Sequence, residues 1–180
     1  SSRLDTAIVV PGKDRVKLTM MLKSDPLMDK INIYWNDRQD YMVINAGDRK
    51  KDTITVYLTP LSEGNYNFQV YTYDKKGHSS VVFNTSGEVY GDGYASALTA
   101  RPVKSADQSS GGEDYVLYFG RPAQGDIGAR IKYQNNKGNA VTMYLSADSA
   151  RILLPDYQPN SPFTVESMFK PEADFIDTFF

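Results

Sequence analysis

The sequence has 180 residues, no cysteine and a single histidine, His78. Without cysteine there can be no disulfide, no thiolate nucleophile and no cysteine-ligated metal or cluster. One histidine excludes a two-histidine zinc site and leaves one candidate for imidazole acid or base chemistry. We therefore expect a protein that is not an enzyme, with no catalytic residue, no cofactor and no metal.

The sequence also lacks an excess of charge of one sign, and it has no long apolar run. The formal net charge is −2, with acidic and basic residues interspersed, so no basic stripe exists that could neutralise phosphates. No apolar run approaches the roughly 20 residues that cross a bilayer. We expect no nucleic-acid partner and no membrane contact by this chain itself.

Tyrosine is frequent, with 13 residues, and β-branched residues are plentiful. These residue types suit pleated, half-buried surfaces better than helices, so we expect an all-β fold. In the first half, short alternating segments are separated by turn residues, as in a β-sandwich. We expect strands at residues 7–10, 16–22, 31–35, 41–44, 53–58, 66–73 and 81–90.

Gly91-Asp92-Gly93 interrupts this pattern, and a second series of strand-like segments follows. We place a boundary near residues 91–96 and predict two tandem β-sandwich domains, at residues 1–92 and 93–180. In the second domain we expect strands at 99–105, 115–119, 129–133, 141–145 and 152–154, one beginning near Phe163, and a last strand at 175–179.

Each half resembles a fibronectin type III module. Leu61 and Tyr66 match the tyrosine corner of such modules, and Gly77 matches the turn after the sixth strand. The resemblance has exceptions: the usual tryptophan of the second strand is Met20 in the first half and Phe119 in the second. The second corner carries Phe163, whose ring cannot donate the corner hydrogen bond.

Several longer segments resemble the Bacteroidetes family known as the domain of unknown function numbered 4998. They are Val9–Thr19, Lys23–Pro26, Ile33–Asn36, Val70–Asp74, Glu88–Asp92, Leu153–Tyr157 and Ile176–Phe179. The resemblance implies an extracellular protein at the outer-membrane surface, with a signal peptide and lipid anchor upstream, as part of a longer chain. It implies no catalytic or ligand-binding residue.

The strongest candidate site is a group of tyrosines. In the type III strand order, the third, fourth and sixth strands share a sheet, which places Tyr34, Tyr41, Tyr71 and Tyr73 near its outer face. Such a face could stack on a sugar ring or contact a partner protein. Alternatively, cross-strand aromatic pairs simply stabilise the sheet, by about 0.2 to 1 kcal/mol each, and we favour this explanation.

Other candidates have ordinary explanations. Trp35 shares phase with Ile31 and Ile33 and is expected in the core. His78 is expected to be an exposed turn residue. The acidic pairs Glu113-Asp114 and Glu172 with Asp174 could in principle act as the two acids of a glycosidase, but acids in loops of a small sandwich rarely do so. Asp25, Asp92 and Asp126 lack the spaced acidic loop of a calcium site, and the glycosylation pattern at Asn84 is weak by itself.

We therefore expect a non-catalytic cell-surface module, either a structural spacer or a protein-interaction domain, in a glycan-capture or adhesion system. The alternative is a carbohydrate-binding module that uses the exposed aromatics of the first domain. Its partner would be a glycan or another surface protein. Any ligand should bind the first domain, because the second lacks the Tyr71 and Tyr73 pair.

Overall fold

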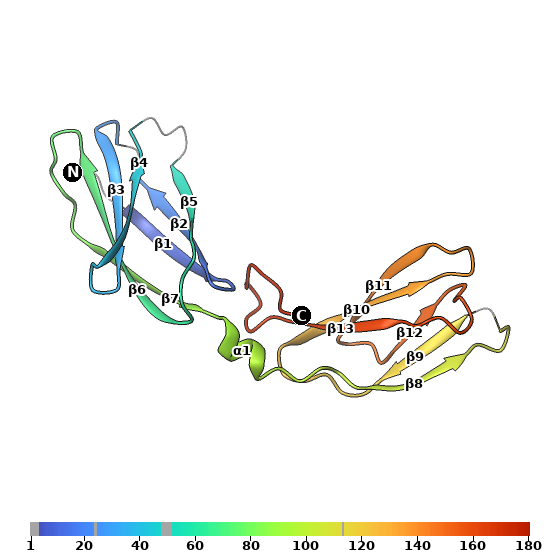
Figure 1. The fold of residues 1–180 in the computed structure, drawn as a ribbon. Coiled ribbons are helices and arrows are strands. Elements are labelled where there is room, and N and C mark those ends of the chain that lie inside the picture. The colour runs from blue at the N-terminus through green and yellow to red at the C-terminus, as the bar shows by residue number, and fades with distance from the viewer. Residues whose placement is uncertain (1–3, 24, 48–51, 113) are drawn as a thin grey trace. The chain divides into compact units, whose positions relative to one another are not determined.

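A computed structural model describes residues 4–23, 25–47, 52–112 and 114–180, and the fold is nearly all β, as predicted (Figure 1). One compact unit comprises residues Ser1–Tyr94 with Asp174–Ile176, and the other comprises Ala95–Ala173 with Asp177–Phe180. We predicted from the sequence that residues 1–92 and 93–180 are two separate domains. Whether each domain folds by itself stays a prediction. No helix in the described part of the chain is long and apolar enough to span a membrane.

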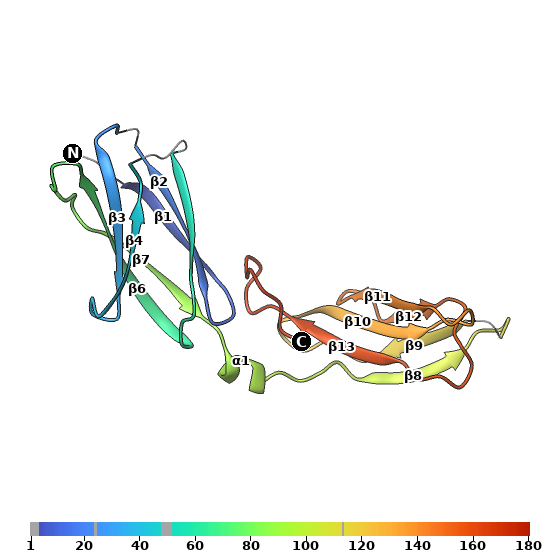
Figure 2. The same ribbon diagram turned by 45° about the horizontal axis from the view of Figure 1, so that its top comes forward.

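The first unit has two antiparallel sheets, β1-β2-β5 and β4-β3-β6-β7 (Figures 1 and 2). Their strands are β1 (Leu4–Pro11), β2 (Val16–Leu22), β3 (Met28–Trp35), β4 (Asp40–Asn45), β5 (Thr53–Leu58), β6 (Gly64–Asp74) and β7 (Phe83–Val89). All seven overlap the segments predicted from the sequence.

The core of the first unit follows from alternation along the strands. In β2, Val16, Leu18, Met20 and Leu22 are buried, and in β6 the buried residues are Phe68, Val70 and Thr72. Because successive side chains of a strand point to opposite faces, the intervening residues of β6 lie on the outer face of its sheet. The core therefore determines which residues are available for binding.

The tyrosine corner is present. The Tyr66 hydroxyl donates a hydrogen bond to the Ser62 carbonyl at 2.6 Å, and Leu61 is buried. This interaction connects the segment before β6 to the strand itself. It confirms the corner that the spacing of Leu61 and Tyr66 predicted.

The second unit also has two antiparallel sheets, β12-β9-β8 and β11-β10-β13. The strands are β8 (Val103–Gln108), β9 (Tyr115–Phe119), β10 (Asp126–Gln134), β11 (Ala140–Ser146), β12 (Arg151–Leu154) and β13 (Thr164–Phe169). The first strand begins four residues later than the predicted Thr99, after Pro102, which has no backbone N–H to donate to a ladder.

The predicted last strand at residues 175–179 was wrong. The described residues after β13 form no further strand, and only an isolated bridge joins Phe179 to Phe169. Pro171 follows β13 and begins a series of bends. The apolar residues Phe175 and Ile176 are adjacent rather than alternating, so they cannot both face one side of a strand. The second unit thus has six strands in its described residues.

A short helix, α1 (Asp92–Ser96), was not predicted from the sequence. The Glu63 carboxylate accepts hydrogen bonds from the backbone N–H groups of Gly91, Gly93 (2.9 Å) and Tyr94 (3.1 Å). These bonds satisfy N–H groups that the first turn of a helix leaves without partners. A side chain at Gly93 would collide with the Glu63 carboxylate, so the carboxylate would have to shift away from these N–H groups.

Candidate functional site

The four predicted tyrosines lie on the outer face of the β4-β3-β6-β7 sheet. Tyr34 of β3 pairs with Tyr41 of β4, while Tyr71 and Tyr73 alternate along β6. The ring centroid of Tyr34 is 6.1 Å from that of Tyr41 and 5.9 Å from that of Tyr71, the latter in an edge-to-face arrangement. We call these four residues the tyrosine face.

Two cations cover most of the tyrosine face. The guanidinium of Arg38 lies 4.5 Å from the ring centroid of Tyr34 and 5.3 Å from that of Tyr71, and the Lys30 ammonium lies 5.1 Å from that of Tyr73. These are cation–π distances. Tyr41 is 63% exposed, whereas the other three tyrosines are half-buried. Of the four rings, Tyr41 is therefore the most available to a ligand.

Arg38 is placed by the turn between β3 and β4. Three consecutive residues of this turn, Asn36, Asp37 and Arg38, have positive φ angles of 52°, 52° and 66°. The Gln39 N–H donates to the Asn36 carbonyl at 3.0 Å, and the Asn36 amide donates to the Asp40 carboxylate at 3.0 Å. Left-handed backbone is unfavourable for residues other than glycine, so the turn stores strain beside the tyrosine face.

The hydroxyls of the tyrosine face have different environments. The amide of Asn32, which is only 8% exposed, donates to the Tyr34 hydroxyl at 3.0 Å, and this bond is the main reason that the pKa of Tyr34 is lowered. Burial raises the pKa of Tyr73, with a further contribution from neighbouring Tyr34. A hydrogen bond donated to the oxygen stabilises the charged phenolate and lowers the pKa, whereas burial destabilises the phenolate and raises the pKa.

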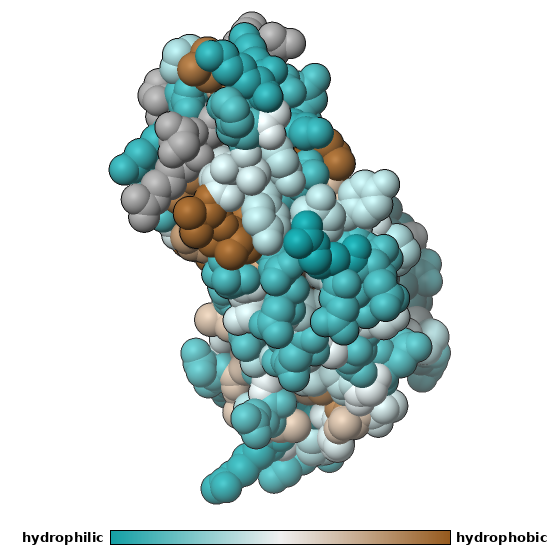
Figure 3. Space-filling view, turned by 90° about the vertical axis from the view of Figure 1, so that its left-hand side faces the viewer, coloured by the Kyte–Doolittle hydropathy of each residue, from teal (hydrophilic) through white to brown (hydrophobic). Residues whose placement is uncertain are grey.

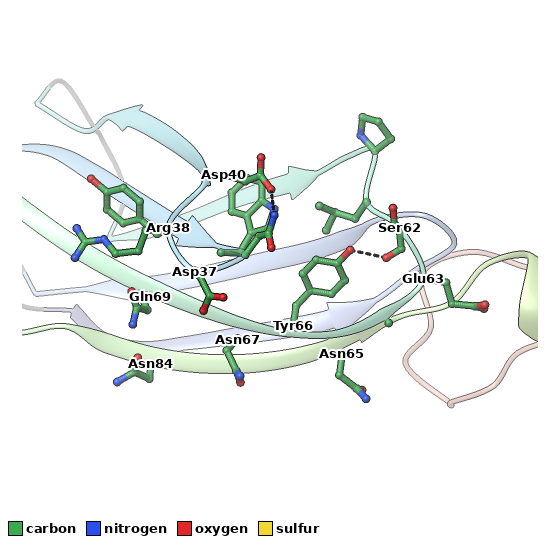
Figure 4. Close-up of a pocket in the computed structure, with 16 residues that line it drawn as sticks. Asp37, Arg38, Asp40, Ser62, Glu63, Asn65, Tyr66, Asn67, Gln69 and Asn84 are labelled. Atoms are coloured by element: carbon green, nitrogen blue, oxygen red, sulfur yellow. Dashed lines mark hydrogen bonds between the residues drawn. The ribbon is translucent and has the colours of Figure 1, made fainter.

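A groove of about 950 Å³ begins at Tyr34 and Arg38 and runs along the same unit (Figure 4). The β3–β4 turn supplies Asn36, Asp37, Arg38 and Asp40. The corner before β6 supplies residues 60–64. The outer positions of β6 and β7 contribute four side-chain amides, those of Asn65, Asn67, Gln69 and Asn84. We call this surface the amide groove.

Trp35 and Tyr66 connect the amide groove to the core. Trp35 packs edge-to-face on Phe68, with ring centroids 6.1 Å apart, as its core phase predicted. It is only partly buried, however, and also lines the groove. Burial is the main reason that the pKa of Tyr66 is raised. Both rings are held firmly by packing.

A family model described as a domain of unknown function, DUF4998, matches residues 1–179. The chain belongs to the DUF4998 family. Among curated proteins, none matches this DUF4998 chain in sequence. The strand order of its first unit, β1-β2-β5 and β4-β3-β6-β7, agrees with the fibronectin type III-like sandwich expected from the sequence.

Three solved structures similar to the DUF4998 chain each share 11% sequence identity with it. The FN1–FN3 domains of chicken CNTN1 match 92% of this chain and 58% of theirs, with a TM-score of 0.49. A two-domain fibronectin type III segment of chicken tenascin matches 99% and 95%, with a TM-score of 0.39. Dimeric latent PorU from Porphyromonas gingivalis matches 86% and 17%, with a TM-score of 0.38. The chain thus spans less than two thirds of the CNTN1 and PorU chains.

The other sequence candidates lie in turns and strands of the DUF4998 chain. His78 is exposed and contacts Asp74, with 3.1 Å between Nδ1 and Oδ2. Asp25 and Asp126 each accept a hydrogen bond from a backbone N–H two residues later. Glu113 lies outside the described residues. No group of three or more potential metal ligands occurs among the residues searched.

Among the described residues of the second unit, no group of tyrosines equivalent to the tyrosine face occurs. At the corresponding positions Arg130 of β10 lies between Tyr144 of β11 and Glu166 of β13, and the guanidinium is 2.9 Å from the Glu166 carboxylate. Its corner also differs, because Phe163 has no hydroxyl and Tyr157 donates to the Ser161 carbonyl instead. At these positions the second unit has one tyrosine and an ion pair, whereas the first unit has four tyrosines with two cations.

Arg38 and the amide groove were not predicted from the sequence. Arg38 reaches two rings because three residues of its turn have positive φ angles. No local sequence pattern predicts this backbone conformation. Asn65, Asn67 and Gln69 do alternate in the sequence and could have been recognised as one outward row. Asn84 joins them only through its pairing with Gln69.

Proposed function

We propose that this chain is a non-catalytic interaction module of a bacterial surface lipoprotein, working in a glycan-capture or adhesion system. The observation that carries the proposal is the gathering of four tyrosines and Arg38 on one outer sheet face. Tyrosine and arginine are enriched in protein interfaces, where they supply much of the binding energy. Fibronectin type III-like sandwiches are typical of structural and interaction modules.

The surface location belongs to the same proposal. It is supported by the resemblance of the sequence to a family expected at the outer-membrane surface. A signal peptide and lipid anchor would lie upstream of Ser1 in the longer protein. The absence of cysteine is compatible with either redox compartment and carries no weight.

Cross-linking in intact cells tests the proposal. A photoreactive p-benzoylphenylalanine at position 41 of the full-length protein should form an adduct with a partner, because Tyr41 is the most exposed ring of the tyrosine face. The matched control is position 144, since Tyr144 is 64% exposed on the other unit. Digestion of the cross-linked cells with external proteinase K checks the surface location.

Adducts at both positions in equal yield, or at neither, would contradict an interaction through the tyrosine face. Absence at both would instead favour a structural spacer. An adduct that external protease cannot reach would contradict the surface location alone.

The second candidate function is carbohydrate binding through the exposed aromatics. Of the predicted rings Tyr34, Tyr41, Tyr71 and Tyr73, we propose Tyr41 as the one that contacts the sugar. Cations already lie over the other three rings. The amide groove, which begins at Tyr34, supports this candidate.

A further inference from the structure

The amide groove presents a row of uncharged hydrogen-bonding side chains. Asn65, Asn67 and Gln69 occupy alternate outward positions of β6, so neighbouring members are about 7 Å apart along the strand. Asn84 of β7 pairs with Gln69 and extends the row sideways. Figure 4 shows these residues on one side of the β6 and β7 ribbons, with Asp37 beside them.

These amides have no structural task in the part of the chain that the structure describes. None of the four side chains hydrogen-bonds to another described residue, in contrast to Asn135, whose side chain accepts two backbone N–H groups in its turn. Asparagine is also depleted from strands. Residues that break local preferences without a structural gain tend to mark functional positions.

The groove also contains rigid aromatic surface. Trp35 and Tyr66 both line it, and each packs against Phe68 with ring centroids about 6 Å away, at 6.1 and 5.9 Å. Because their hydrophobic contacts hold them in place, little side-chain entropy would be lost on binding. By strand alternation Trp35 and Tyr66 lie on the core side of the sheet and the amides on its outer side, so the rings border the groove while the amides form its outward row.

We infer that the amide groove binds a neutral oligosaccharide. A sugar ring has an apolar face that can pack on an aromatic ring, and hydroxyls that both donate and accept hydrogen bonds. Side-chain amides offer a donor and an acceptor in one plane and so match neighbouring hydroxyls. The inference rests on the proposed function, because it specifies the ligand of the same binding unit.

Charge indicates that the sugar is neutral. Among the lining residues Asp37, Asp40 and Glu63 are acidic and Arg38 is basic, and the Arg38 guanidinium already lies over two tyrosine rings. An anionic glycan would meet unfavourable charge here. Moreover, the coloured surface in Figure 3 is mostly hydrophilic, with hydrophobic residues in small separate groups.

Affinity electrophoresis of the chain in gels that contain soluble polysaccharide tests the inference. The neutral probes are yeast mannan, galactomannan, xyloglucan and mixed-linkage β-glucan, and polygalacturonate is the anionic comparison. We expect retardation by at least one neutral probe and none by polygalacturonate. Simultaneous Asn67→Ala, Gln69→Ala and Asn84→Ala changes should weaken that retardation about tenfold or more, because several hydrogen bonds are lost.

A matched control removes three exposed amides from the second unit, by Gln134→Ala, Asn136→Ala and Asn139→Ala. It should bind as the unmodified chain does, and both triple variants should keep its melting temperature. No retardation by any neutral probe, or equal retardation of the groove variant, overturns the inference.

Two further outcomes separate this inference from the proposed function. Loss of binding in Tyr41→Ala with full binding by the groove variant would place the sugar on the tyrosine face, so the groove inference alone would fail. If position 41 cross-links to a protein partner and no polysaccharide retards the chain, the proposed interaction module would stand. The inference of sugar binding would then be refuted.

Discussion

At the scale of single residues, hydroxyl groups that look equivalent in the sequence have different roles. The Tyr66 hydroxyl donates to the Ser62 carbonyl and closes the corner before β6. The Tyr34 hydroxyl accepts a hydrogen bond from Asn32. Tyr41, by contrast, is largely exposed. A sequence count of 13 tyrosines cannot distinguish these roles.

Tyr66→Phe removes only the corner hydroxyl. We expect a loss of about 1 kcal/mol in the free energy of unfolding, because a typical intramolecular hydrogen bond contributes about 0.5 to 1.5 kcal/mol. Urea denaturation, followed by fluorescence of Trp35 in the same unit, measures it. Tyr57→Phe in the same unit is the control, since Tyr57 is 47% exposed and no hydrogen bond of its hydroxyl occurs among the described residues. Equal stability of the two variants would show that the corner bond contributes nothing.

At the scale of elements, the β3–β4 turn is the least expected part of the first unit. The sequence predicted strands at residues 31–35 and 41–44, and the structure joins them by a turn at residues 36–39. The sequence did not predict three successive left-handed residues. This conformation brings Arg38 over Tyr34 and Tyr71 and places Asp37 at the amide groove. The strained turn thus joins the two candidate binding surfaces.

Substitution of Asp37 tests the strain. Asp37→Gly should raise the free energy of unfolding by about 0.5 kcal/mol, because glycine adopts positive φ readily but is more flexible when unfolded. Asp37→Val should lower it by about 1 to 2 kcal/mol, since a β-branched residue is a genuine outlier at positive φ. Chemical denaturation measures both. A stabilising valine or a strongly destabilising glycine would contradict the left-handed assignment.

At the scale of the whole molecule, we expect acid to lower the folding stability of both units. The N–H groups of Tyr94, Gly91 and Gly93 lower the pKa of Glu63, those of His78 and Lys76 help to lower the pKa of Asp74, and Arg130 lowers the pKa of Glu166. A carboxylate whose pKa is lower in the folded state stabilises that state above its unfolded pKa, about 4. This stabilisation is lost as pH falls through the folded pKa.

We therefore expect unfolding stability to be constant near neutral pH and to fall below about pH 4. Glu63→Gln should be less stable than the unmodified chain at pH 7, and the difference should shrink as acid protonates Glu63 in the unmodified chain. Thermal denaturation from pH 7 to 3 measures this. A difference that grows as pH falls would contradict the sign. Asp148→Asn in the second unit is the control, because Asp148 is exposed.

The sequence by itself determined the all-β class, the strands of the first unit and the outer face that holds four tyrosines. It could do so because alternation, turn residues and the Tyr66 corner are local signals. Only the tertiary structure decided that Arg38 and Lys30 cover three of those rings, and that amides from β6 and β7 form one groove. These features depend on strand register and on the backbone of one turn, which bring together residues far apart in the sequence.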